Sequence, residues 1–209
     1  HRAICKKKNE PIKIIDKTKK IRSEEGISLL IPTLGKVSFD KFQTIISELI
    51  KKDLIYIRNF EIIIIFNQKN KNEFYKKLIQ EYSHIKEVKV IHESSIGIVN
   101  ALNKGIQNSK YNYIGRQDDD DISYPLRVTK TLSYLKKNNL SLAFSKCKII
   151  RNDKISNWKK KIINPLKIQL LFYNPFVHAT MVIKKNSLIR ENGYSFKNGA
   201  EDHELFIRL

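Results

Sequence analysis

The chain alternates short runs of branched apolar residues with segments whose apolar positions recur every three or four residues. Residues 27–32 (ISLLIP) and 61–66 (EIIIIF) are dense in Ile and Leu, which is typical of strands covered on both faces of a sheet. The segment between them carries four apolar residues at helical spacing, Phe39, Phe42, Ile46 and Leu49. This stretch therefore predicts a strand, a helix and a second strand.

The same alternation continues to residue 115. Residues 88–92 (VKVIH) and 111–115 (YNYIG) predict two further strands. A helix is indicated before each of them, by Phe74, Leu78 and Tyr82 and then by Val99, Leu102 and Ile106. Such repeated crossovers predict an α/β fold, in which a mostly parallel sheet has helices on both faces. Sheets of this kind bind ligands at the carboxyl ends of their strands.

The pattern changes beyond residue 121. An apolar stripe of Val128, Leu132 and Leu135 predicts a helix, with Ser123 as its N-cap and Pro125 tolerated in its first turn. Shorter strands are expected at residues 140–145, 147–150 and 179–183, and a helical stretch near 165–173.

The 209 residues, 41% of them hydrophobic, suffice for one full core and one main domain. Residues 1–26 are rich in Lys and lack a sustained period, so we expect a basic lead-in segment before a domain over residues 27–209. The helical pattern still runs at Leu209, which indicates truncation at the C-terminus. Two cysteines, no secretory signal and no long apolar run predict a cytoplasmic protein.

Lys and Arg outnumber Asp and Glu by 40 to 21, which gives a formal net charge of +19. Such an excess suits nucleic acid, the anionic inner face of a membrane or phosphorylated substrates. The lysines are dispersed along the chain, which favours a general compositional bias over a nucleic-acid-binding face interleaved with aromatics. A nucleic-acid-binding protein therefore stays as an alternative, and peripheral contact with an anionic membrane stays open.

Against this basic background, four aspartates stand together at residues 118–121, directly after a predicted strand. Adjacent carboxylates repel one another, and a divalent cation would remove the conflict. In an extended backbone Asp118 and Asp120 would point to one side, with Asp119 facing away. Hard oxygen ligands of this kind suit Mg²⁺ or Mn²⁺, which fill their remaining positions with water and phosphate oxygens.

The segment around these aspartates, YIGRQDDDDISYPLR at residues 113–127, resembles the YIARxDADDxxxPxR segment of family 2 glycosyltransferases with the GT-A fold. Four more segments are similar to motifs of that family in the same order along the chain. They are ISLLIPTLGK (27–36), GIVNALNKGI (97–106), NPFVHATMVIKK (174–185) and GAEDHELFIRL (199–209).

The resemblance implies a GT-A, Rossmann-like fold and a metal-dependent, inverting transfer of a sugar. The donor would be a nucleotide-diphosphate sugar, a UDP-sugar first of all, and the acceptor a hydroxyl of a glycan or lipid-linked glycan in polysaccharide synthesis. By the same resemblance Asp118 and Asp120 would hold Mn²⁺ or Mg²⁺, and Asp202 would be the catalytic base that takes the acceptor's proton.

The resemblance also assigns the remaining site residues. Those expected on the donor side are Pro32, Thr33, Asn67, Asn103, Arg116, Asp119 and Asp121. His178 and Glu201 are expected on the acceptor or phosphate side. Where the family commonly has DDGS after the second strand, this chain has FNQK at residues 66–69, so an amide replaces a carboxylate that would contact the base.

A third reading is a nucleotidyltransferase, because these enzymes also join a parallel sheet to metal-binding acids. They usually carry a Gly-rich phosphate loop after the first strand. Residues 31–39 (IPTLGKVSF) contain a single glycine and do not supply that loop.

Overall fold

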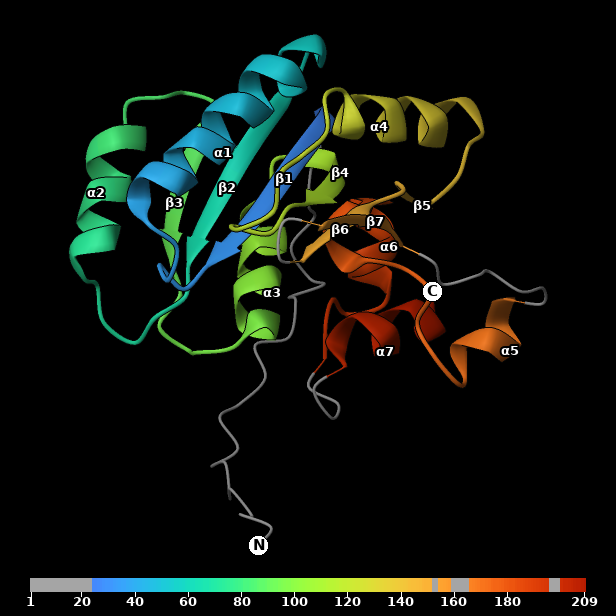
Figure 1. The fold of residues 1–209 in the computed structure, drawn as a ribbon. Helices are drawn as coiled ribbons and strands as arrows, with labels where there is room; N and C mark the ends of the chain where they lie inside the picture. The colour runs from blue at the N-terminus through green and yellow to red at the C-terminus, as the bar shows by residue number, and fades with distance from the viewer. Residues whose placement is uncertain (1–23, 152–153, 159–165, 196–199) are drawn as a thin grey trace, which may run out of the picture.

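The structure is a computed structural model that describes residues 24–151, 154–158, 166–195 and 200–209. Its centre is a six-stranded sheet in the order β3-β2-β1-β4-β8-β5 (Figure 1). Most of the predicted lead-in segment, residues 1–23, lies outside the described residues. The first strand, β1 (Glu24–Thr33), begins three residues earlier than the apolar run predicts.

Four neighbouring strands run parallel: β3 (Val88–His92), β2 (Phe60–Phe66), β1 and β4 (Tyr111–Arg116). The helices that connect them are α1 (Phe39–Lys52), α2 (Glu73–Tyr82) and α3 (Ile98–Asn108). The predicted alternation of strands and helices is confirmed in this half of the molecule. A short 3-10 helix, η1 (Leu54–Tyr56), follows α1.

The second half adds antiparallel strands to the sheet. β8 (Met181–Lys184) pairs antiparallel with β4 on one side and with β5 (Leu142–Phe144) on the other. A separate hairpin of β6 (Lys148–Arg151) and β7 (Lys154–Asn157) stands beside the sheet. The remaining elements are α4 (Arg127–Lys137), α5 (Leu166–Leu170), η2 (His178–Thr180), α6 (Lys185–Arg190) and α7 (Glu201–Arg208).

Alternate residues of the central strands face two separate apolar clusters. Leu29 and Ile31 of β1 pack in the cluster that α1, α2 and α4 cover, whereas Leu30 packs with α3, α6 and α7. Because both faces of each strand are covered, the strands carry unbroken apolar runs such as Ile62 to Phe66, all fully buried. The carboxyl ends of β1, β2 and β4 are thereby held at one edge of the sheet.

The start of α4 differs from the sequence prediction, in which Ser123 caps the helix. The helix begins at Arg127, and its N-cap residue Leu126 has a left-handed backbone (φ 60°) and makes no side-chain capping bond. Instead the buried carboxylate of Asp53 accepts hydrogen bonds from the N–H groups of Val128 (2.7 Å) and Thr129 (2.9 Å). A carboxylate from the end of α1 therefore supplies the cap that the local sequence lacks.

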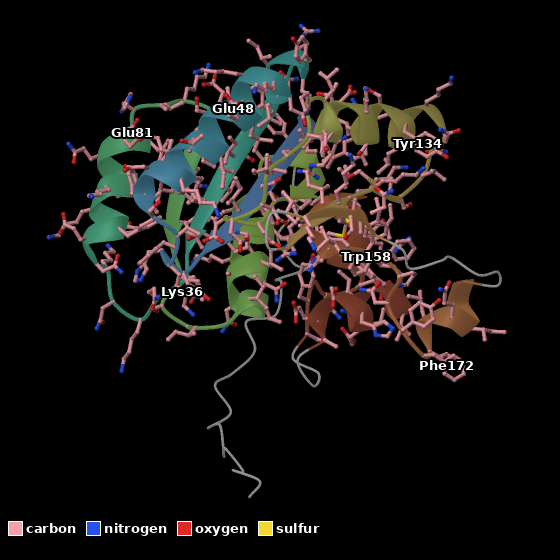
Figure 2. The ribbon with its side chains drawn as sticks, in the orientation of Figure 1. Lys36, Glu48, Glu81, Tyr134, Trp158 and Phe172 are labelled. Carbon is pink, nitrogen blue, oxygen red and sulfur yellow. The ribbon has the colours of Figure 1, made fainter. Side chains whose placement is uncertain are left out.

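Among the described residues, the helices are too short or too polar for any of them to qualify as a membrane-crossing span. Exposed apolar side chains among the described residues include those at η1, along the hairpin and around α5, where Phe172 projects at the margin of the molecule (Figure 2).

Candidate active site

The aspartates lie in a turn that leaves the sheet edge directly after β4. We call residues 117–123 the acid loop. Its fold depends on Gln117, which is buried and whose side-chain amide donates to the carbonyls of Asp118 (3.0 Å) and Asp121 (2.8 Å). One side chain thus closes the loop on itself.

Arg127 fixes the acid loop from the side of α4. Its guanidinium donates to the Gln117 side-chain oxygen (2.9 Å), the Ser123 hydroxyl (2.9 Å) and the Ala179 carbonyl (3.3 Å). Burial lowers the pKa of Arg127, and the charges of Asp53, Asp121 and Asp118 oppose that shift. These hydrogen bonds from Arg127 therefore fix the acid loop next to the end of β4.

The carboxylates of the loop do not alternate as in an extended chain. The backbone turns at Asp119 and Asp120, and residues 118–120 all line one cavity. Asp118 pairs with Arg116 (2.7 Å), and Asp119 accepts a hydrogen bond from the Thr33 hydroxyl (2.5 Å). The prediction that Asp119 faces away is wrong, because a turn removes the two-residue period on which it rested.

Burial raises the pKa of three carboxyl groups in this loop. For Asp118 the Arg116 charge opposes the effect of burial and Asp120 adds to it. For Asp119 the hydrogen bond from Thr33 opposes burial, while Asp120 and Asp118 add to it. For Asp121 the neighbouring aspartates Asp118 and Asp120 act in the same direction as burial. Burial and the neighbouring aspartates therefore both disfavour the charged form of these three groups.

The cavity at the strand ends has a volume of about 340 Å³, and we call it the strand-end cavity. One wall is charged, with Arg116 and residues 118–120, and the other is apolar, with the start of α3. Lys36, which also lines the cavity, lies at the carboxyl edge of β1 in Figure 2. The described lining residues are Pro32, Thr33, Leu34, Lys36, Val37, Asn67, Ile96, Gly97, Ile98, Ala101, Arg116, Asp118, Asp119 and Asp120.

Asn67 shapes this cavity through the backbone. Its amide donates to the carbonyls of Glu93 (2.9 Å) and Ser95 (2.8 Å), and its oxygen accepts the N–H of Gly97 (2.8 Å). Gly97 has a φ of 134°, which favours glycine, and stands at the N-cap of α3. Asn67 thus holds the loop that brings the start of α3 to the cavity.

Arg116 is the positive group of the strand-end cavity. Its side chain is 10% exposed, and its Nε is buried without a hydrogen-bond partner. A buried guanidinium with an open donor is expensive unless an anion or another acceptor reaches it. Arg116 therefore has unused capacity for an anionic ligand beyond its pair with Asp118.

His178 is close enough to Arg116 for the charge of the guanidinium to act on its ring. Its Nε2 is 2.7 Å from the Tyr194 hydroxyl, and both residues are buried. Burial, together with the charge of Arg116, lowers the pKa of His178 well below its usual value, so the ring is neutral at pH 7. His178 lines neither of the two cavities that meet the acid loop.

Asp202 and Glu201 begin α7, a short distance along the chain from Tyr194. Asp202 accepts a hydrogen bond from the Asn174 side chain (2.9 Å) and one from the N–H of His203 (2.7 Å). Both carboxylates are close enough to raise the pKa of Tyr194, although burial is the larger cause. Neither carboxylate lines either of the two cavities at the acid loop. Like Arg116, however, both are close enough to Tyr194 for their charges to act on its hydroxyl.

Asn103 differs from its expected place on the donor side. It is 2% exposed, and its amide exchanges two hydrogen bonds with the main chain of Tyr194 (both 2.9 Å). This pair joins α3 to the segment before α7. The structure therefore gives Asn103 a supporting role in the fold.

A second cavity, of about 720 Å³, lies on the other side of the acid loop, and we call it the hairpin cavity. It shares Asp120 and no other described residue with the strand-end cavity. Asp121, which was expected on the donor side, lines this second cavity. The described lining residues are Lys41, Gln117, Asp120, Asp121, Ile122, Ser123, Tyr124, Arg127, Lys146, Cys147, Lys148, Ile149, Ile150, Ile155, Trp158, Val177, Ala179 and Thr180.

The donor set of the acid loop fits an ion that takes only part of its shell from protein. Among the described residues there is no convergence of three or more His, Cys, Asp or Glu side chains that could hold a metal ion. Mg²⁺ and Mn²⁺ commonly take one or two carboxylates and complete their shells with water and phosphate oxygens. Asp118 and Asp120, which share one cavity wall, are carboxylates of that kind.

Four residues that support the site or its surroundings by hydrogen bonds were not among the predicted site residues: Gln117, Arg127, Asn174 and Tyr194. Arg127 closes the segment that resembles the family, and Gln117 stands directly before the aspartates, so both had a local signal. Asn174 opens the segment at residues 174–185 that also resembles the family, but its pairing with Asp202, 28 residues away, had no local signal. The pairing of Tyr194 with Asn103, 91 residues away, had none either.

Known proteins with similar sequences are glycosyltransferases. The chain is 32% identical over 154 residues to the O-antigen biosynthesis glycosyltransferase WbnJ of Escherichia coli, covering 72% of this chain and 60% of that protein. It is 28% identical over 121 residues to the amylovoran biosynthesis glycosyltransferase AmsE of Erwinia amylovora, covering 56% of this chain and 45% of that protein. The chain thus spans about half to three fifths of these relatives.

Solved structures share the fold of this chain. S. aureus TarS 1-349 in complex with UDP-GlcNAc matches with a TM-score of 0.65 at 15% identity, covering 86% of this chain and 52% of that one. The mannosyltransferase PcManGT from Pyrobaculum calidifontis, in complex with GDP-Man and Mn²⁺, matches with a TM-score of 0.62 at 12% identity, covering 87% and 51%. These matches bear out the predicted GT-A sheet.

The family assignment rests on most of the described domain. Residues 28–195 match the sequence pattern of Glycosyl transferase family 2, a span that runs from β1 past α6 and includes the acid loop. The relatives and the fold agree with that match, and the chain belongs to glycosyl transferase family 2.

Proposed function

We propose that this domain catalyses a metal-dependent, inverting transfer of a sugar from a nucleotide-diphosphate sugar to a hydroxyl of a glycan or lipid-linked glycan, in surface polysaccharide synthesis. One observation carries the proposal. Three consecutive carboxylates and a buried guanidinium with an open Nε line one cavity at the carboxyl edge of a parallel sheet. Such a cavity can bind a cation and a diphosphate side by side.

In this proposal Asp118 and Asp120 hold Mn²⁺ or Mg²⁺. The bound ion would neutralise negative charge on the diphosphate leaving group. Burial and the mutual repulsion of the aspartates raise the pKa values of Asp118, Asp119 and Asp121. A bound cation would offset both effects, because it stabilises the charged carboxylates. Mn²⁺ in the PcManGT complex supports the choice of ion by analogy of fold.

Arg116 binds the diphosphate in the proposed complex, because it lines the strand-end cavity and its buried Nε has no hydrogen-bond partner. Thr33 and Pro32 at the end of β1, with the Gly97 loop that Asn67 holds, border the space for the nucleoside. UDP and UDP-GlcNAc in the TarS complexes support a UDP-sugar as the first donor to test.

Asp202 acts as the general base and takes the proton from the attacking hydroxyl. Asn174 holds one of its carboxylate oxygens, which orients the group. Glu201 precedes it in the first turn of α7 and is proposed to bind the acceptor, and His178 to act on the phosphate side by supporting Arg116. A cytoplasmic location, with or without peripheral membrane contact, stays a prediction.

The proposal is tested by calorimetric titration of UDP in the presence of Mn²⁺. We expect saturable binding that EDTA abolishes, and at least a roughly tenfold weaker affinity in Asp120→Ala, because one ligand of the ion is removed. Asp40→Ala is the matched control, since Asp40 is an exposed aspartate in the first turn of α1 outside the cavity. Equal UDP affinity in Asp120→Ala and the parent protein would overturn the metal assignment.

A further inference from the structure

We propose that the hairpin cavity binds the acceptor and that this acceptor is an anionic saccharide, carrying a phosphate or carboxylate group. The inference rests on the proposed function, because it takes the strand-end cavity as the donor site. It adds the place and the chemical class of the second substrate.

The position of the hairpin cavity follows from the acid loop. The loop separates the two cavities, and Asp120 is the one described residue that lines both. A reaction between two bound molecules requires that their sites meet at the reacting atoms. A ligand in the hairpin cavity and a ligand in the strand-end cavity would meet at Asp120.

The wall formed by the hairpin is apolar and uncovered. Ile150 of β6 and Ile155 of β7 are directly paired across the two strands, and they are 61% and 64% exposed. Tyr124, which lies between the acid loop and α4 and is 59% exposed, lines the same space. An exposed cross-strand pair of isoleucines beside a tyrosine offers the flat apolar surface that packs against a sugar ring.

Trp158 completes this wall and connects it to the proposed base. Its indole N–H donates to the Pro175 carbonyl (2.8 Å), and Figure 2 shows it beside the hairpin. The adjacent residue Asn174 binds Asp202, and Val177 lines the cavity. The segment from Asn174 to Val177 therefore contacts both the hairpin cavity and Asp202, so an acceptor there binds against the segment that orients the base.

Charge selects the class of saccharide. Lys41, Lys146 and Lys148 line the cavity, and within the described parts of the chain none of them forms an ion pair with a carboxylate. The ammonium group of Lys148 lies 5.6 Å from the centre of the Tyr124 ring. A cation close to a ring that can contact a sugar is placed to pair with an anionic substituent of that sugar.

The acids of the loop set the orientation of the acceptor. Asp120 and Asp121 would repel an anionic group at the acid-loop side of the cavity, whereas Lys146 and Lys148 attract it to the hairpin. The acceptor therefore binds with its anionic group at β6 and a hydroxyl toward the acid loop. A neutral sugar would leave the lysines without a partner and bind more weakly.

Trp158 is the only tryptophan in the chain, so its fluorescence reports on this cavity. We would titrate the protein with N-acetylglucosamine 1-phosphate and glucuronic acid, and with their neutral counterparts N-acetylglucosamine and glucose. We expect a saturable change with at least one anionic sugar, roughly tenfold tighter than its neutral counterpart. Equal responses to charged and neutral sugars, or no response, would overturn the proposal.

The variant Lys146→Glu/Lys148→Glu should lose this response. Its control, Lys51→Glu/Lys137→Glu, makes the same change of net charge at exposed lysines outside the cavity and should keep it. If the first variant unfolds, Lys146→Gln/Lys148→Gln with a smaller charge change should still weaken the response several-fold. Equal losses in the cavity and control variants would mean that overall charge causes the binding.

Donor binding is measured separately, by UDP and Mn²⁺ calorimetry on the same variants. The cavity variants should bind UDP as the parent protein does. If UDP with Mn²⁺ displaces the anionic sugar, that sugar occupies the donor site and the acceptor proposal fails. If UDP fails to bind while Trp158 still reports the anionic sugar, the proposed function fails instead.

Discussion

Asp202 is the residue on which the chemistry of transfer depends in our proposal. Asp202→Asn keeps the size of the side chain and an oxygen that can accept the hydrogen bond from Asn174, but it removes the proton acceptor. We expect kcat to fall by about 10²- to 10⁴-fold, with little change in UDP affinity.

Steady-state transfer assays on the full-length protein measure this effect, with Glu73→Gln, at an exposed carboxylate in the first turn of α2, as the control. Near-normal turnover in Asp202→Asn would leave Asp202 as a residue that only starts α7. A parallel loss of UDP binding would place it in the phosphate site.

A substitution of Asp119 tests how far its half-buried carboxylate lowers the free energy of unfolding when no substrate is bound. Its pKa is raised by burial, so the folded protein holds the proton more tightly than the unfolded chain does. The free energy of unfolding therefore falls as the pH rises from the pKa of Asp119 in the unfolded chain, roughly 3.9, to its pKa in the folded protein. Above the folded-state pKa, the full destabilisation remains.

Asp119→Asn removes that cost and keeps an acceptor for the Thr33 hydroxyl. In EDTA we expect a higher Tm than the parent protein at pH 7, and a difference that closes as the pH falls below about 4. Asp40→Asn, at an exposed site, should show no such gain. A gain that does not change with pH would indicate a packing effect.

The residues of the site were predictable where the chemistry is local. Four consecutive acids after an apolar run are visible in the sequence, and so is their strand-end position. The long-range pairings in and around the site are not visible there, because Thr33 meets Asp119 across 86 residues and Asn103 meets Tyr194 across 91. Such pairs depend on the register of the sheet and the packing of α3, which no local pattern encodes.

At the scale of elements, α4 depends on α1 through Asp53. Asp53→Ala would leave the buried N–H groups of Val128 and Thr129 without their acceptor, and we expect a loss of about 2–4 kcal/mol in the free energy of unfolding. At the exposed start of α1, the Ser38 hydroxyl caps the helix by accepting a hydrogen bond from the N–H of Lys41. Ser38→Ala removes this cap and should lower the free energy of unfolding by only about 0.5–1 kcal/mol. Urea unfolding of the two variants gives the comparison, and equal losses would contradict a special role for Asp53.

The sequence pattern predicted the strands that are covered on both faces, but it did not predict the exposed strand β7. β1 to β4 carry runs of apolar residues and were predicted. β7 has the sequence KISN, with all four side chains exposed, and was missed because its pairing with β6 needs no apolar face. The start of α4 was misplaced at Ser123, because its cap comes from a residue 75 positions away.

For the whole molecule, the boundary of the domain can be tested by deletion. We expect removal of residues 1–22 to leave the Tm unchanged, because their composition offers no periodic apolar face. Removal of residues 1–26 should lower it, because Glu25 pairs with Lys136 and the N–H of Gly26 donates to Asn112. Thermal unfolding of both deletions decides the boundary, and a loss of cooperative unfolding in the shorter deletion would extend the domain upstream.

The place of β8 in the sheet has a consequence for the protein during its synthesis. β1, β2, β3 and β4 can pair as soon as they emerge, but the outer edge of β4 pairs only with Met181–Lys184. Ribosomes add about 5–20 residues per second, so this edge stays open for several seconds. An open strand edge beside apolar side chains such as Ile114 attracts other chains. The nascent half-sheet is therefore the stage at which this protein most needs protection from aggregation.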